Sequence, residues 1–142
     1  MAEQRRPDLA AMLGGLMRTL MAAESPVLAE HGLTMWGYVV LSALDDRPVR
    51  TQAALAKAIG ADKTRIIGTL DVLQEDGLIN REPDPADRRV RLLEITDAGR
   101  KARRSAQTRI QAQENRLLAQ LPAGDREAFL RAAHVLSEIE RN

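Results

Sequence analysis

Two short runs with strand-like alternation interrupt a chain whose other segments have helical spacing. The runs are Leu78–Glu82 and Val90–Ile95, and the connector Pro83–Arg89 between them holds two prolines and several charges. A charged, proline-rich connector between two strands is typical of an exposed turn. We therefore predict one β-hairpin, with a solvent-exposed loop at Pro83–Arg89, inside a mainly α-helical protein.

Two short helices are predicted directly ahead of this hairpin, over Gln52–Ile59 and from Asp62 to about Asp76. Threonine and aspartate accept hydrogen bonds from the free amides at a helix start, and glycine adopts the left-handed conformation that ends many helices. Because the two helices are joined across Gly60–Ala61, the segment reads as a helix-turn-helix. The capping and terminating residues are Thr51, Gly60, Asp62 and Gly77.

Apolar residues at three- and four-residue steps predict an N-terminal helix from Asp8 to Glu24. We expect a break at Ser25–Pro26, followed by a short helical piece that ends at Gly32, because proline lacks the amide a helix interior needs. The next helix is predicted to start after Thr34 and to stop at Asp45, Asp46 and Pro48.

Two more helices are predicted after the hairpin. A long one begins after the capping residue Thr96, carries Asp97 in its positive first turn, and breaks at Pro122–Gly124. The last runs from about Asp125 to Glu140 and is expected to bury four apolar residues. These are Phe129, Ala133, Leu136 and Ile139.

Charge is distributed unevenly along the 142 residues, although the whole chain carries a formal charge of only +1. The stretch from Arg47 to Arg104 has a net charge of +4 and the two ends together have −3. A basic centre between acidic flanks indicates a local surface for a polyanion. The ends contain no apolar run of 18 residues and no signal-peptide pattern, which predicts a cytoplasmic protein without a membrane segment.

Catalytic chemistry has little support in this composition. Cysteine is absent, so disulfides, thiolate metal sites and cysteine-based catalysis are excluded. The two histidines, His31 and His134, lie about a hundred positions apart, and no phosphate-binding glycine loop or metal-spaced cluster is present. We therefore expect neither an enzyme nor a cofactor or metal site.

Several motifs in the middle of the chain resemble those of the MarR family of transcriptional regulators. The similarity is densest from Thr34 to Gly99, whereas the flanking helices match in length and position. The motifs are Thr51–Ala56, Asp62–Thr64, Leu73 with Gly77–Ile79, Asp84–Arg89 and Ile95–Gly99. The resemblance implies a winged helix-turn-helix core with long N- and C-terminal dimerisation helices, in which 62–76 is the recognition helix and 84–89 the tip of the wing.

The recognition helix supplies most of the predicted DNA contacts. A helix fits the major groove, and its N-terminus favours phosphate while nearby side chains meet base edges. Arg65 and Lys63 are the leading candidates. The full predicted set in this helix is Asp62, Lys63, Thr64, Arg65, Ile67 and Gly68, and Thr51 and Gln52 are candidates for contact with the DNA backbone.

At the wing tip, Arg88 and Arg89 lie beside Asp87. One arginine can enter the narrow minor groove while the carboxylate steadies its neighbour. In the family pattern Asp87 and Arg89 form the acid–base pair, and a wing arginine reaches DNA. Which of Arg88 and Arg89 enters the minor groove is left open. Without the neighbouring motifs, the alternative interpretation of this cluster is a solvated turn.

Two recognition-helix residues depart from the family pattern, which commonly has a polar residue and an arginine where this chain has Ile67 and Gly68. Ile67 can meet a thymine methyl group. Gly68 costs about 1 kcal/mol of helix stability relative to alanine, which a close approach of the backbone to DNA would offset. A neutral surface substitution is the alternative interpretation of Gly68.

The terminal helices, 8–32 and 97–141, hold more apolar surface than the lobe at 34–96 can cover, within what we interpret as one domain over 1–142. The family dimerises through these ends, so we expect a twofold interface and a palindromic operator. An intramolecular core is the alternative. The interface candidates are Leu9, Leu13, Leu16, Leu20, Phe129, Leu136 and Ile139.

Many family members release DNA when a small, often aromatic, acid binds between the dimer interface and the DNA-binding lobe. By this resemblance a small-molecule effector is a candidate partner here, although its identity cannot be read from the sequence. Each pocket candidate also fits an ordinary core or surface role. The candidates are His31, Trp36 and Tyr38, with Met12 or Leu16 as a wall.

The sequence thus predicts a repressor that binds double-stranded DNA as a homodimer. The main alternative is a protein-interaction module that uses a winged-helix scaffold without reading DNA. Binding of single-stranded RNA is disfavoured, because one Trp, one Tyr and one Phe cannot form a stacking platform.

Overall fold

The computed structural model describes residues 5–46 and 49–139, with the side chains of Val49, Arg50 and Lys63 outside the description. It is mainly α-helical with one antiparallel sheet, as predicted. The elements in chain order are α1 (Leu9–Glu30), α2 (Met35–Asp46), β1 (Val49–Thr51), α3 (Gln52–Ile59), α4 (Lys63–Glu75), β2 (Ile79–Asp84), β3 (Asp87–Ile95), α5 (Asp97–Leu118) and α6 (Asp125–Ser137).

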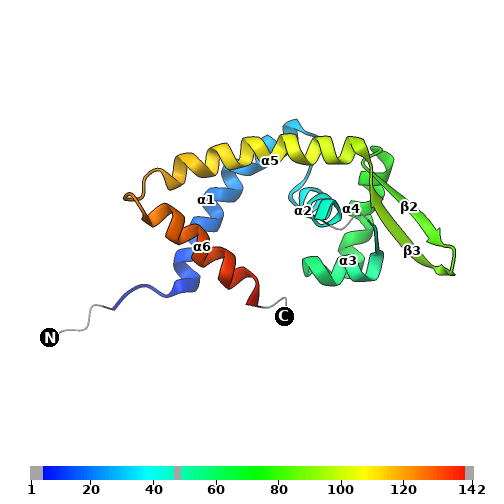
Figure 1. Cartoon of the computed structure of the whole chain (residues 1–142), viewed down its shortest axis with the longest axis horizontal. Coiled ribbons are helices and arrows are strands. Elements are labelled where there is room, and N and C mark those ends of the chain that lie inside the picture. The colour runs from blue at the N-terminus through cyan, green and yellow to red at the C-terminus, as the bar shows by residue number, and fades with distance from the viewer. Residues whose placement is uncertain (1–4, 47–48, 140–142) are drawn as a thin grey trace.

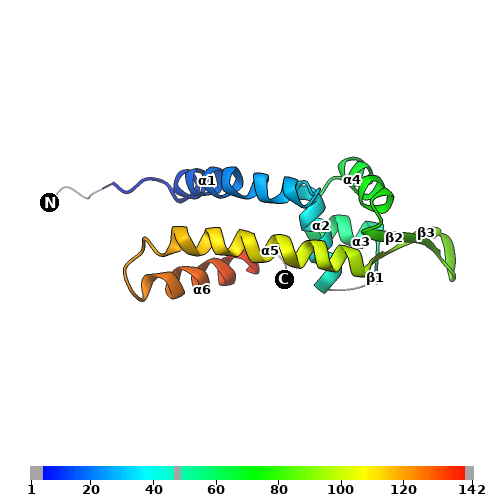
Figure 2. The same ribbon diagram turned by 90° about the horizontal axis from the view of Figure 1, so that it is seen from above.

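Helix α5 runs along most of the molecule and joins two parts (Figure 1). At its N-terminal end lies the winged-helix lobe, which consists of α2, α3, α4 and the sheet, and from which the β2–β3 hairpin projects. At its C-terminal end lies the helical arm, which consists of α1, α6 and the second half of α5 (Figure 2). The hairpin and the N-terminal half of α1 therefore point to opposite ends of the molecule.

Helix starts follow the predicted caps. Thr51 Oγ1 accepts a hydrogen bond from the Ala54 amide at 3.0 Å, and Thr96 Oγ1 accepts one from the Gly99 amide at 3.0 Å. Each bond satisfies one of the amides that a first helical turn leaves without a partner. Asp62 and Thr34 cap α4 and α2 in the same way.

The predicted break at Ser25–Pro26 is wrong, because α1 continues through both residues to Glu30. A proline inside a helix removes one main-chain hydrogen bond, and packing can offset that loss. Here Val27 and Leu28, directly after the proline, are buried in the core, and the Ser25 hydroxyl donates to the Met21 carbonyl at 2.8 Å. No single helix among the described residues has the length and hydropathy of a membrane span; only α1 and α2 together, bent by 79°, meet that test.

The hairpin loop is shorter than predicted. The strands extend to Asp84 and from Asp87, so only Pro85 and Ala86 form the turn. Side chains close it locally, because Asp84 Oδ1 accepts the Ala86 amide at 2.9 Å. A register shift between Pro83 and Asp84 accompanies the turn, and Pro83 is tolerated because β2 is an edge strand.

A third strand, β1, was not predicted. It pairs antiparallel with β3 and places that strand at the centre of the sheet, in the order β1-β3-β2. Three residues are too few to show an alternating pattern, and the pairing of Arg50 with Leu93 spans 43 positions of the chain. The strand anchors the start of α3 to the base of the wing.

The buried core lies mainly in the winged-helix lobe and extends along α5 to Ala106 and Ile110. The prediction that α6 buries its apolar residues is wrong within one chain, because none of its residues is buried and Phe129 is 39% exposed. Glu140 and Arg141, at the predicted end of the last helix, lie outside the described residues. The helical arm therefore presents apolar side chains to solvent.

Candidate nucleic-acid interface

Helix α4 has one buried and one exposed face. Ile66, Leu70 and Leu73 point into the core, as their spacing predicts, and this fixes the helix on the lobe. On the other face Arg65 and Ile67 are exposed, Ile67 by 44% of its surface. Thr64 and Gly68 are also exposed, while the Lys63 side chain lies outside the described part of the structure. An exposed isoleucine beside an exposed arginine gives this face both apolar and cationic groups.

The Asp62 side chain caps the N-terminus of α4. Its Oδ1 accepts the Thr64 amide at 3.1 Å, which is the bond of a helix N-cap. A carboxylate in this position stabilises the positive end of the helix. Asp62 thus orders the first turn of α4, on which Thr64 and Arg65 lie.

The wing carries the acid–base pair that the sequence suggested. Asp87 Oδ1 accepts hydrogen bonds from the Arg89 amide at 3.1 Å and from Arg89 Nε at 3.3 Å. The Arg89 side chain nevertheless remains 92% exposed, so this pair contributes little to stability. Arg88 is exposed as well. The carboxylate therefore orients one arginine and leaves its guanidinium accessible.

Residues from α3, α4 and the wing line one surface hollow of the winged-helix lobe. It brings Thr51 and Gln52 at the start of α3 together with Ile67 of α4 and Arg89 of β3. The first and last of these residues lie 38 positions apart in the chain, and all four were predicted site residues. The other lining residues are Ala53, Ala56, Ile66, Val90 and Arg91.

An ion pair that was not predicted from the sequence links the wing to α4. Arg81 of β2 donates its Nε hydrogen to Gln74 Oε1 at 2.7 Å and a second hydrogen, on Nη2, to Asp71 Oδ1. Its side chain is 19% exposed. The sequence did show that Asp71 and Gln74 are one helical turn apart and so share one face of α4. It did not show that Arg81 of β2 lies opposite that face.

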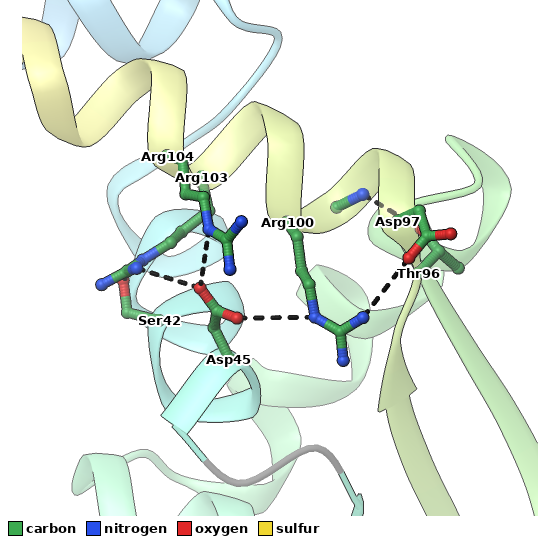
Figure 3. A network of polar contacts seen from close by, with 8 residues as sticks. Ser42, Asp45, Thr96, Asp97, Arg100, Arg103 and Arg104 are labelled. Atoms are coloured by element: carbon green, nitrogen blue, oxygen red, sulfur yellow. Dashed lines mark hydrogen bonds and ion pairs between the residues drawn. The ribbon is translucent and has the colours of Figure 1, made fainter.

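A second missed network ties α5 to α2 (Figure 3). Asp45, only 11% exposed, pairs with Arg103 at 2.9 Å, Arg100 at 3.5 Å and Arg104 at 3.9 Å. Arg100 also contacts Asp97, the residue predicted in the first turn of α5. Three arginines around one carboxylate fix the orientation of the winged-helix lobe on α5.

Two of the predicted effector-pocket residues, His31 and Tyr38, lie where α1, α2 and α5 meet. His31 follows α1 and contacts Ser105 Oγ of α5 through Nε2 at 2.9 Å. Tyr38 of α2 is half-buried, and this burial raises its pKa above the ordinary value. Trp36 is 39% exposed.

The proposed wall of that pocket lies elsewhere in the chain. Leu16 precedes His31 by fifteen helical residues, which is about 22 Å along α1. It lines an apolar hollow with Leu20, Phe129 and residues of α5, and Met12, a further turn away, is 44% exposed. Within one chain, α1 therefore separates Met12 and Leu16 from His31 by four turns or more.

Two carboxyl groups meet between α1 and α5. Partial burial, together with a hydrogen bond and charge repulsion from Glu114, raises the pKa of Glu24 to about 7. The pair shares a proton below that pH. Glu114 also lines the apolar hollow that contains Leu16. No local pattern in the sequence marks this pair, because Glu24 and Glu114 lie 90 positions apart.

No group of three or more His, Cys, Asp or Glu residues within the described ranges could hold a metal ion. The features of the lobe are instead a helix-turn-helix, a projecting hairpin and exposed cationic groups on both. This combination defines a winged-helix protein of the type that recognises double-stranded nucleic acid.

Comparison with known proteins identifies the family. Residues 31–90 match the model described as MarR family. The transcriptional regulator HosA of Escherichia coli O111:H- is 32% identical over 98 residues, which are 69% of this chain and 73% of HosA. The repressor NicR of Pseudomonas putida is 31% identical over 96 residues, 65% of this chain and 61% of NicR. The chain thus spans less than two thirds of NicR. It belongs to the MarR family, whose members are transcription regulators and not enzymes.

Solved structures agree with this assignment over nearly the whole chain. The repressor CouR bound to a 23-mer DNA duplex superposes with a TM-score of 0.82 at 28% identity, covering 92% of each chain. CouR from Rhodococcus jostii RHA1 bound to p-coumaroyl-CoA gives a TM-score of 0.79 at 28% identity, covering 96% of this chain and 95% of CouR. The predicted winged-helix fold and MarR family are therefore confirmed.

Proposed function

We propose that this regulator binds double-stranded DNA as a homodimer and represses transcription from a palindromic operator. The hollow that joins Gln52, Ile67 and Arg89 on one face of the winged-helix lobe is the observation that carries the proposal. Helix α4 enters the major groove and the wing reaches the adjacent minor groove. The structure of the related repressor CouR bound to a 23-mer DNA duplex supports the binding of double-stranded DNA.

Each element of the interface has a chemical role in the proposal. Arg65 contacts a guanine edge, Ile67 contacts a thymine methyl group, and Lys63 and Thr64 contact phosphate at the start of α4. Thr51 and Gln52 contact the DNA backbone at the start of α3, where free amides favour phosphate. Asp62 holds the first turn of α4 in place. The exposed backbone at Gly68 allows close approach to the duplex.

At the wing, the ion pair with Asp87 orients Arg89 beside the hollow, and Arg88, the preceding residue of β3, is exposed. One of the two enters the minor groove and the other binds the flanking phosphate. Single substitutions decide between them, because loss of a minor-groove contact weakens binding mainly at A·T-rich sites, whereas loss of a phosphate contact weakens binding to all sequences.

The helical arm supplies the proposed twofold interface. Its helices expose large apolar side chains that a lone chain leaves in contact with water. A second copy that covers them would also set two α4 helices about 34 Å apart, one turn of DNA. The exposed apolar residues of the arm are Leu9, Met12, Leu13, Met17, Met21, Leu121, Phe129, Leu130, Val135, Leu136 and Ile139.

Selection of bound duplexes from a random pool, followed by salt titration on the selected site, tests DNA binding. We expect a palindromic consensus and a steep, linear fall of log K with log salt, since Lys and Arg release counterions from phosphate. No enriched sequence, or a flat salt response, would instead support the protein-interaction module.

The contact assignment is tested with Arg65→Ala, Arg88→Ala and Arg89→Ala. Arg65→Ala is expected to weaken operator binding by about 1 to 3 kcal/mol and random-sequence binding much less. Equal losses of affinity for the operator and for random-sequence DNA would show that Arg65 contacts phosphate and not a base. Arg116→Ala, which removes an exposed arginine of the helical arm, is the matched control and should leave affinity unchanged.

Sedimentation of the full chain tests the interface. We expect the mass of two chains, and Leu136→Glu should shift it towards that of one. Val72→Glu is the control, because Val72 is similarly exposed but lies on α4. A monomeric native chain would contradict the twofold interface.

A small phenolic or aromatic effector is proposed to bind beside Tyr38, with His31 and Trp36 nearby, and to release DNA. The p-coumaroyl-CoA complex of CouR supports this ligand class. Titration of the DNA complex with p-coumaroyl-CoA and simple phenolic acids should release the operator, and Tyr38→Ala should raise the ligand concentration required. The absence of release by all of them would contradict the proposed ligand class.

A further inference from the structure

One arginine of the wing, Arg81, bonds to the recognition helix, and it lines a surface hollow with Gln52, Gln74 and Arg91. Arg81 is the third residue of β2, two positions out from the buried Ile79 and paired in register with Leu93. From there it reaches Asp71 and Gln74 on α4 with two separate nitrogens. It therefore contacts α4 at the level of the hairpin where the core residue Leu93 lies on the neighbouring strand.

The geometry of this contact restricts motion in more than one direction. A guanidinium is planar, and its donors have fixed directions, so bonds from Nε and Nη2 to two acceptors fix both distance and angle. Asp71 and Gln74 lie three residues apart and share one face of α4. The Arg81 side chain is 19% exposed, compared with 92% for Arg89, so its contact is far better shielded from solvent.

Beyond Arg81, the side-chain bonds described for the outer hairpin stay within it, at Asp84–Ala86 and Asp87–Arg89. These bonds shape the turn but do not connect it to α4. A two-stranded ribbon is flexible when nothing supports its outer half. Among the side-chain hydrogen bonds of the described residues, those of Arg81 thus connect the hairpin to α4.

We infer that Arg81 is a positioning residue for operator recognition, which holds the wing at the angle to α4 that lets both elements enter adjacent grooves. Arg81 acts through Asp71 and Gln74 and does not itself contact DNA. This inference rests on the proposed function, since it specifies how two parts of one DNA-binding surface are held together.

A distance measurement tests the positioning without any DNA. The chain contains no cysteine, so Glu75→Cys on α4 and Ala86→Cys at the wing tip accept spin labels specifically. Electron–electron double resonance should give a narrow distance distribution for this pair in the otherwise native chain. Arg81→Ala should broaden or shift the distribution, and Glu82→Ala, which removes the exposed charge next to Arg81 in β2, should leave it unchanged. An unchanged distribution in Arg81→Ala would overturn the inference.

Binding measurements test the consequence for recognition. Arg81→Ala should lower operator affinity roughly tenfold while the slope of log K against log salt stays the same. A slope reduced by about 1 would mean that Arg81 contacts phosphate directly, and would overturn the inference. Asp71→Ala should also weaken DNA binding, because it removes a partner of Arg81. The lost negative charge alone would instead strengthen binding to DNA. Tighter binding by Asp71→Ala would contradict the positioning role.

The wing arginine provides an internal check. Arg89→Ala should lower operator affinity less in the Arg81→Ala variant than in the native chain. The reason is that a wing that is not held in place brings Arg89 to its DNA contact less often. Additive losses would contradict the inference. If the native chain binds no duplex, the proposed function fails, and the distance measurement still decides whether Arg81 holds the wing.

Discussion

Gly99 of α5 lies against the main-chain carbonyl of Leu78, at the junction between α4 and the wing. A Cβ built on Gly99 would overlap that oxygen and stand 2.8 Å from Ile95 Cγ1. The same carbonyl accepts the Thr96 amide at 3.0 Å, just before α5 begins. The close approach therefore fixes the start of α5 on the base of the hairpin.

Gly99→Ala is expected to destabilise the protein by about 2 to 4 kcal/mol, although alanine is the better helix former. The clash involves backbone, which cannot move aside as a flexible side chain can. Urea unfolding followed by circular dichroism measures the change. A free energy of unfolding equal to or above that of the native chain would contradict the packing described here.

Gly68→Ala should have the opposite effect on stability. Nothing lies within 4 Å of a Cβ at this position, so the substitution should add up to about 1 kcal/mol through helix propensity alone. The same variant separates the two interpretations of Gly68. Weaker operator binding by the more stable variant indicates close approach of the backbone to DNA, and unchanged binding indicates a neutral surface position.

Asp45→Ala should cost about 2 kcal/mol, because it leaves Arg100 and Arg103 without the acid at the α2–α5 junction. Asp97→Ala is the matched control, since it also removes an acid that contacts Arg100 but one that is fully exposed. Asp97→Ala should destabilise the protein much less than Asp45→Ala does, because solvent screens an exposed ion pair. Equal losses for the two variants would show that burial of Asp45 is unimportant.

Stability should fall as the pH rises from about 5 to about 7. Glu24 has a pKa of about 7 in the folded chain and an ordinary value of 4.5, so the folded state binds the extra proton in this window. The stabilising contribution of protonated Glu24 is complete below pH 4.5 and is lost as the pH rises through about 7. Glu24→Gln should remove this dependence and raise stability above pH 7 by about 1 kcal/mol, allowing for solvent screening of a half-exposed group.

Glu30→Gln is the contrasting control for that experiment. A hydrogen bond from Arg109 lowers the pKa of Glu30, so its contribution appears as the pH rises and is lost in acid. At pH 8 Glu24→Gln should therefore raise the free energy of unfolding and Glu30→Gln should lower it, and only the effect of Glu24→Gln should change between pH 5 and pH 8. The same direction for both would contradict the shared proton between Glu24 and Glu114.

The helix-turn-helix and the wing were predictable because their signals are local. Thr51, Asp62 and Thr96 bond to amides two or three residues ahead, so their neighbours in the sequence decide their role. The error at Pro26 has a different origin. Burial of Val27 and Leu28 outweighs the lost main-chain bond, and this burial exists only after α1 packs against the lobe.

The sequence by itself thus determined where the helices of the lobe begin, that a hairpin follows them, and which residues of α4 face outward. Tertiary structure alone decided that Arg81 meets Asp71, that Asp45 meets Arg103 from 58 positions away, and that β1 joins β3. Caps and turns form within a few residues, so chain neighbours specify them. The longer-range contacts form only when packing brings distant segments together, and no local pattern records which segments those are.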